Sequence, residues 1–262
     1  MKPQASPVLT APRPARVRSP ASLILLALVW LGLAIAGSFA SVFLVALSVS
    51  LHNSAIPASG GLAWRMPGDV MLALLGGAAL QLILLFAALH RARIEGGGSR
   101  SAGFGNTRIE RPGLITALAL LLAGSLGALV ILAAYGFVPV PRTGLTKLTA
   151  QIARAGIGIK TATCVLVVVL APIAEECFFR GWLWTALRQF WAPGAVILCT
   201  SLLWLGVHAL DSPSRPLFLL PAGVILGLAR HFGASIRASL AIHVFNNALI
   251  VALVALAYLM QH

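Results

Sequence analysis

Two adjacent acids, Glu175 and Glu176, interrupt a strongly apolar stretch of the chain and are followed by Arg180. A charge at the centre of a membrane-spanning helix costs roughly 2.5–3.5 kcal/mol, so such residues normally face a polar cavity and carry function. On a helix, Glu176 and Arg180 lie one turn apart and can pair, whereas Glu175 points about 100° away. Pro172 removes one backbone hydrogen bond just before the acids and can kink the helix. An ion pair that only joins helices would leave Glu175 unexplained.

Two histidines and an asparagine in other apolar stretches add further groups with catalytic chemistry. His208 lies near the end of one stretch, and His243 lies well inside another, with Asn247 one helical turn further on. A carboxylate, two imidazoles and an amide can activate a water molecule and hold an oxyanion. The same groups could ligate a metal ion that keeps an open coordination position. The residue types alone leave both chemistries open.

Membrane-spanning helices must bring these side chains together. Hydrophobic residues make up 59% of the 262 residues and charged residues only 10%, at a mean hydropathy of +0.95. A soluble domain carries about a quarter charged residues, so the bilayer must be the solvent for most of this chain. We therefore predict an all-α fold, a polytopic transmembrane helical bundle of about seven spans, with six to eight as the range. The expected spans are 21–51, 70–90, 112–140, 161–189, 193–210, 216–230 and 235–258.

The basic residues suggest an orientation and a cellular location. Lys and Arg number 19 against 6 Asp and Glu, a net charge of +13. They lie mostly between apolar stretches, which is typical of loops that face an anionic leaflet and does not indicate nucleic-acid binding. We expect residues 1–20 to form a disordered cytoplasmic tail and the Arg-rich loop 91–111 to lie on the same side. The excess of Arg over Lys is typical of a GC-rich bacterial gene, which suggests the cell membrane of a bacterium, its inner membrane.

The chain divides at about residue 160. Residues 21–160 are expected to form N-terminal membrane helices and loops, with the basic stretch 141–160 as an interfacial helix. Residues 161–262 hold every candidate site residue and form the helical core that carries the site. Three cysteines lie inside apolar runs without disulfide or metal-binding spacing, so we expect them to be packing residues.

Three motifs in a fixed order resemble the CPBP family, the CAAX-prenyl-protease-like and bacteriocin-processing intramembrane endopeptidases that are also called the ABI family. The motifs are E-E-x-x-x-R, aromatic-x-x-x-His and His-x-x-x-Asn, here Glu175, Glu176 and Arg180, then Trp204 and His208, then His243 and Asn247. The resemblance covers about residues 165–255. The family usually has Phe where this chain has Trp204, a change that keeps an aromatic ring. Gly233 before the last motif can end one helix, and Ser235 can cap the next.

The resemblance implies a helical-bundle protease that cuts a peptide bond at or within the membrane, with residues 161–262 as its catalytic core. By analogy, Glu175 and His208 would activate the attacking water. His243 and Asn247 would stabilise the oxyanion, while Glu176 and Arg180 would support the site. Family members are often labelled metalloproteases, and the resemblance allows a divalent metal such as zinc without requiring one. The implied partners are the lipid bilayer and a membrane-associated peptide or protein, prenylated or bearing a leader.

Two other classes of function remain open. A non-enzymatic scaffold, immunity factor or regulatory protein could use the same fold, although the intact set of catalytic-type residues favours an enzyme. A transporter would show two similar halves or a polar pathway through several spans, and neither is evident. Among other intramembrane proteases, a zinc site-2 type is excluded because the chain has no H-E-x-x-H motif.

Overall fold

The computed structural model describes residues 19–54, 68–95, 109–134, 151–210 and 215–261, with the backbone alone at 129–134 and 257–261. Every regular element in these ranges is a helix, which confirms the predicted all-α bundle. The predicted tail lies almost wholly outside the described residues. So do residues 96–108 of the Arg-rich loop and residues 141–150 of the predicted interfacial stretch.

Each of the seven predicted spans coincides with a helical segment. Six of them are α1 (Pro20–Ser54), α2 (Asp69–Ile94), α3 (Pro112–Ala134), α8 (Pro193–Ala209), α9 (Arg215–Phe232) and α10 (Ile236–Gln261). The fourth is an unbroken run of α5 (Ile157–Cys164), η1 (Val165–Leu170), α6 (Ala171–Glu175), η2 (Glu176–Leu183) and α7 (Trp184–Leu187). The two η segments are π-helical, so their backbone hydrogen bonds reach five residues back instead of four.

Four helices in the described ranges are long and apolar enough to cross a membrane: α1, α2, the run Ile157–Leu187 and Ile236–Leu256 of α10. The apolar parts of α3 and α8, Pro112–Ala128 and Pro193–Ala209, are shorter. Each spans about 26 Å, slightly less than the hydrocarbon core of roughly 30 Å. The chain is therefore a multi-pass membrane protein, and a count of seven complete crossings stays a prediction.

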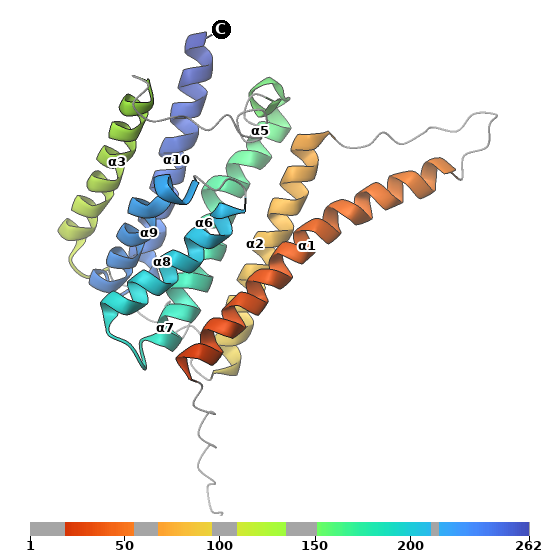
Figure 1. The fold of residues 1–262 in the computed structure, drawn as a ribbon. Helices are drawn as coiled ribbons and strands as arrows, with labels where there is room; N and C mark the ends of the chain where they lie inside the picture. The colour runs from red at the N-terminus through yellow and green to blue at the C-terminus, as the bar shows by residue number, and fades with distance from the viewer. Residues whose placement is uncertain (1–18, 55–67, 96–108, 135–150, 211–214, 262) are drawn as a thin grey trace, which may run out of the picture.

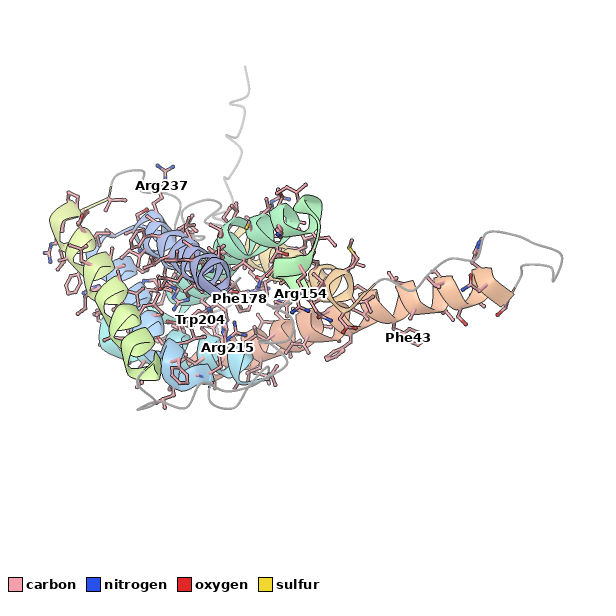
Figure 2. All side chains as sticks on the ribbon, turned by 90° about the horizontal axis from the view of Figure 1, so that it is seen from above. Phe43, Arg154, Phe178, Trp204, Arg215 and Arg237 are labelled. Atoms are coloured by element: carbon pink, nitrogen blue, oxygen red, sulfur yellow. The ribbon has the colours of Figure 1, made fainter. Side chains whose placement is uncertain are left out.

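The helices pack around the fourth run. α1 pairs with α2, which in turn packs against η1, α6 and η2, while α3 packs against α9 and α10. Figure 1 shows α1 crossing α2, with the C-terminal half of α1 projecting away from the bundle. Phe43 lies on this projecting part in Figure 2 and is 65% exposed. An apolar surface of this kind is what a helix presents to lipid tails.

A short turn at residues 188–192 sets the depth of two candidate site residues. It joins α7, which ends at Leu187, to α8, which begins at Pro193. Glu175 lies 12 residues before Leu187, and His208 lies 15 residues after Pro193. Both residues therefore stand several helical turns above the same turn, and both line one cavity, although one is mid-helix and the other is near a helix end.

The tight turn between α9 and α10 has the capping pattern that the sequence predicts. The Gly233 amide donates to the carbonyl of Ala229 at 2.9 Å and closes α9. The Ser235 hydroxyl accepts a hydrogen bond from the Arg237 amide at 3.2 Å and caps α10. A Cβ atom on Gly233 would lie 2.3 Å from the Cβ atom of Ala238 and 2.8 Å from the Ala229 carbonyl oxygen. The turn therefore has no room for a side chain at residue 233.

Gly233→Ala is expected to lower the free energy of unfolding by about 1–3 kcal/mol, because the added methyl group meets atoms that cannot rotate away. Thermal unfolding of detergent-solubilised protein measures the change. Gly206→Ala is the matched control, since a Cβ atom on Gly206 in α8 would meet nothing within 4 Å. A Gly233→Ala protein that melts at the same temperature as the control would contradict this account of the turn.

Candidate active site

The carboxylate of Glu175 accepts hydrogen bonds from two different helices. Gln81 of α2 donates from Nε2 to Oε1 at 3.0 Å, and Trp204 of α8 donates from Nε1 to Oε2 at 2.6 Å. Glu175 is the last residue of α6 and is 8% exposed. Both oxygens thus act as acceptors for donors that approach from opposite sides, and this arrangement suits an ionised carboxylate.

Pro172 explains how α10 is joined to the fourth helix. In the π-helical register of η1, the Ala171 amide donates to the carbonyl of Leu166, five residues back. The next carbonyl in this register is that of Val167, and its partner would be residue 172, a proline without an N–H group. Asn247 of α10 supplies the missing donor, with its Nδ2 atom 2.8 Å from the Val167 oxygen. The bond that the proline removes is therefore replaced by a side chain of another helix.

Glu176 and Arg180 form the ion pair that their spacing predicts, at 3.3 Å and with both side chains 0% exposed. Arg180 also donates from Nη2 to the Gly223 carbonyl of α9 at 3.2 Å. Glu176 also accepts a hydrogen bond from His243, whose Nδ1 atom lies 3.0 Å from the same carboxylate oxygen, Oε1. A carboxylate can only accept, so Nδ1 carries the hydrogen. This leaves Nε2 of His243 beside Glu175, 3.8 Å from its Oε2 atom.

His208 lies half-buried near the end of α8. Its Nδ1 atom is 2.9 Å from the Trp204 carbonyl oxygen, so Nδ1 carries the hydrogen and the lone pair of the neutral ring is on Nε2. The indole ring of Trp204 lies between the two histidines, with centroid distances of 4.4 Å to His208 and 5.8 Å to His243. One tryptophan therefore contacts Glu175 and both imidazoles.

A single cavity brings these residues together. Its volume is about 340 Å³, and its wall includes the four predicted catalytic residues, Glu175, His208, His243 and Asn247. Trp204 lies among the packed helices in Figure 2, and both Trp204 and Arg215 line the cavity. The supporting pair predicted from the sequence, Glu176 and Arg180, is buried directly behind this wall. The structure thus brings all six predicted residues into one region, and their chemical roles stay a prediction.

The described donors do not form a metal site of the usual kind. No three His, Cys, Asp or Glu side chains in the described ranges come together as ligands of a metal ion. Structural and catalytic zinc sites use at least three such protein ligands. The described side chains therefore do not make up a three-ligand zinc site by themselves.

One comparison with known proteins gives a match. Residues 158–249 match the family model described as Rce1-like, the type II CAAX prenyl endopeptidases. This segment is therefore similar to the CAAX proteases, over about a third of the 262-residue chain. No curated protein and no solved structure matches the chain. The match confirms the resemblance stated from the motifs and supports a CAAX-type intramembrane protease.

The CAAX-protease segment contains the four predicted catalytic residues, but the cavity extends beyond it. Gln81 of α2 lines the cavity from outside residues 158–249, and sequence reasoning missed it. A signal was present, because Gln81 is the sole polar side chain between Met71 and Leu89. Asn246 and Arg215 also line the cavity and were missed. Neither stands out in the sequence as a site residue.

The replacement of the family's usual Phe by Trp204 has a structural consequence. Phenylalanine keeps the aromatic ring but has no donor, whereas the indole N–H of Trp204 donates to Glu175. The ring face of Trp204 also lies 5.4 Å from the guanidinium carbon of Arg180. In this chain, the aromatic position therefore contributes a hydrogen bond to the candidate catalytic acid.

Arg180→Met is expected to lower the free energy of unfolding by about 3–5 kcal/mol, because the buried Glu176 carboxylate loses its cation. The double variant Arg180→Met, Glu176→Gln should recover most of that loss, since no uncompensated charge remains. Thermal or denaturant unfolding in detergent measures both effects. Arg93→Met, on an exposed part of α2, is the control and should leave stability unchanged. Equal stability of the Arg180 and Arg93 variants would show that the pair does not hold the helices together.

Proposed function

We propose that this protein is an intramembrane endopeptidase that hydrolyses a peptide bond of a membrane-associated substrate. The observation that carries the proposal is the shared cavity, which Glu175, His208, His243 and Asn247 line from three helical segments. A carboxylate, two imidazoles and an amide around one cavity are the groups that acyl-transfer chemistry needs. The CAAX-protease match over the same residues supports this reaction class.

Water activation is assigned to His208 and Glu175. The Nε2 lone pair of His208 accepts a proton from the water while the water oxygen bonds to the carbonyl carbon of the peptide. Glu175 has further lone pairs besides those that bind Gln81 and Trp204, and one accepts the other hydrogen of the water. The carbonyl π electrons move onto the oxygen. When the oxyanion electrons re-form the C=O bond and the C–N bond breaks, His208 returns the proton to the leaving nitrogen, which gives a carboxylic acid and an amine. Transfer of the acid proton to the amine then leaves a carboxylate and an ammonium group.

Oxyanion stabilisation is assigned to Asn247 and His243. Asn247 uses one Nδ2 hydrogen for the Val167 carbonyl and has a second one to donate. The Nδ1 hydrogen of His243 is directed at Glu176, so His243 can donate from Nε2 only as an imidazolium. The carboxylates of Glu176 and Glu175, 3.0 Å and 3.8 Å away, would balance that charge. Glu176 and Arg180 act as supporting residues that hold the imidazole in place.

The proposed substrate is a peptide or protein that reaches the cavity from the bilayer. A prenylated C-terminal segment is the class that the family description names. A peptide that bears a leader is the second class to test. The panel therefore contains prenylated, leader-bearing and plain versions of membrane-associated peptides, incubated with purified protein in detergent or vesicles.

Glu175→Gln is expected to abolish turnover on whichever peptide the wild type cleaves, because the amide keeps the side-chain shape but loses the negative charge. Cleavage is measured by mass spectrometry of the products. Glu95→Gln is the matched control, since Glu95 is also an acid near the bundle but does not line the cavity. Wild-type turnover in the Glu175 variant would refute the proposed reaction. A wild type that cleaves no peptide in a broad panel would favour the non-enzymatic scaffold.

Asn247→Ala is expected to lower turnover by about 10²–10³-fold with little change in KM, the usual effect of removing one oxyanion donor. It also removes the partner of the Val167 carbonyl, so some loss of stability should accompany it. The double variant Pro172→Ala, Asn247→Ala separates the two effects, because alanine at residue 172 restores an N–H group for that carbonyl. Stability should recover in the double variant while turnover stays low. Recovery of turnover together with stability would mean that Asn247 only joins helices.

A further inference from the structure

Gln81 is a buried polar residue in a helix that is otherwise built for lipid and apolar packing. It is the sole polar side chain between Met71 and Leu89 of α2, and it is 8% exposed. Polar groups inside a membrane helix are costly unless they find a partner, and they commonly mark functional positions. Gln81 lies outside the segment that matches the CAAX-protease family. Neither the family motifs nor the helical packing of α2 accounts for it.

Only half of the Gln81 amide has a partner. Its Nε2 atom donates to Oε1 of Glu175 at 3.0 Å. Because a carboxylate can only accept, the amide nitrogen must face Glu175, and the amide oxygen must point elsewhere. That oxygen is buried and has no hydrogen-bond partner among the described residues. Within the protein, the side chain therefore makes one hydrogen bond, at the desolvation cost of a buried amide.

An apolar residue of similar size would avoid this cost. Leu80 and Leu82 flank Gln81, and Leu84 on the same buried side of α2 is 1% exposed. Methionine at residue 81 would fill the same space without an unpaired oxygen. Packing and stability therefore favour an apolar side chain here. The hydrogen bond to Glu175 is the interaction that gives a polar side chain a role at this position.

The bond fixes the rotation of the Glu175 carboxylate. Gln81 holds one oxygen from α2 and Trp204 holds the other from α8, at 3.0 Å and 2.6 Å. A carboxylate held at both oxygens by donors on separate helices cannot turn about its last bond without breaking one of them. We propose that Gln81 is a positioning residue for hydrolysis, which aims the Glu175 carboxylate at the attacking water. This inference rests on the proposed function and extends the working site beyond residues 158–249 to α2.

Gln81→Met tests the inference with purified full-length protein and the peptide that the wild type cleaves. The expected result is a fall in kcat of about 10²-fold, the usual cost of misplacing a catalytic group, with KM changed less than about twofold. The melting temperature should stay within about 4 °C of the wild type or rise, because the unpaired oxygen is gone. Leu82→Met, on the exposed side of the same helix, is the control and should keep wild-type kcat.

If Gln81 served packing alone, Gln81→Met would keep wild-type kcat, and any effect of the change would be on the melting temperature. Gln81→Met with wild-type kcat, in a protein that Glu175→Gln inactivates, would overturn this inference and leave the proposed function standing. An active Glu175→Gln protein would overturn both. If Gln81→Met melts more than about 4 °C below the wild type, Gln81→Leu gives the decision. Leucine fills a similar space and has no hydrogen to donate to Glu175, so kcat should fall as far as in Gln81→Met. Wild-type kcat in Gln81→Leu would overturn the inference.

Discussion

Burying two neighbouring carboxylates inside a membrane protein demands cations and hydrogen-bond donors, and these come from nearly every helix around the site. Glu176 takes Arg180 from its own helix and His243 from α10. Glu175 takes Gln81 from α2 and Trp204 from α8. An ion in a low-dielectric interior is tolerated only with such compensation. The contacts that neutralise the acids are thus the same contacts that hold α2, α8 and α10 around the fourth helix.

The π-helical segments on either side of Glu175 add to this arrangement. Their backbone leaves carbonyl oxygens that accept hydrogen bonds from side chains of other helices. Asn247 of α10 donates to Val167 in η1, and Arg230 of α9 donates from Nε to the Arg180 carbonyl in η2 at 2.9 Å. In a bilayer no water is present to satisfy such oxygens, so each one either finds a protein donor or costs several kcal/mol. The fourth helical run, with its two π-helical segments, is therefore hydrogen-bonded to α9 and α10.

The site also contains buried polar atoms that lower the stability of the fold while their side chains hold the geometry of the site. The amide oxygen of Gln81 and the Nε atom of Arg180 are buried without a hydrogen-bond partner among the described residues. Groups of this kind are rare in folded proteins, and they concentrate where function constrains the side chain. Gln81 is hydrogen-bonded to Glu175, the candidate catalytic acid, and Arg180 is ion-paired with Glu176, the supporting acid next to it. The same crowding explains why Trp204 contacts Glu175, His208 and His243 at once.

The sequence by itself determined the class of the fold and most of the candidate site. Long apolar stretches can be stable only as membrane helices, and the i and i+4 spacing of Glu176 with Arg180, and of His243 with Asn247, places each pair on one helix face. These are local properties, so they can be read from neighbouring residues. The pairing of Gln81 with Glu175 and of Asn247 with Val167 joins residues 94 and 80 positions apart. Such contacts depend on how the helices pack and on the extra reach of the π turns. Only the tertiary structure could decide them, because no local pattern states which helix will face an unpaired carbonyl or a buried acid.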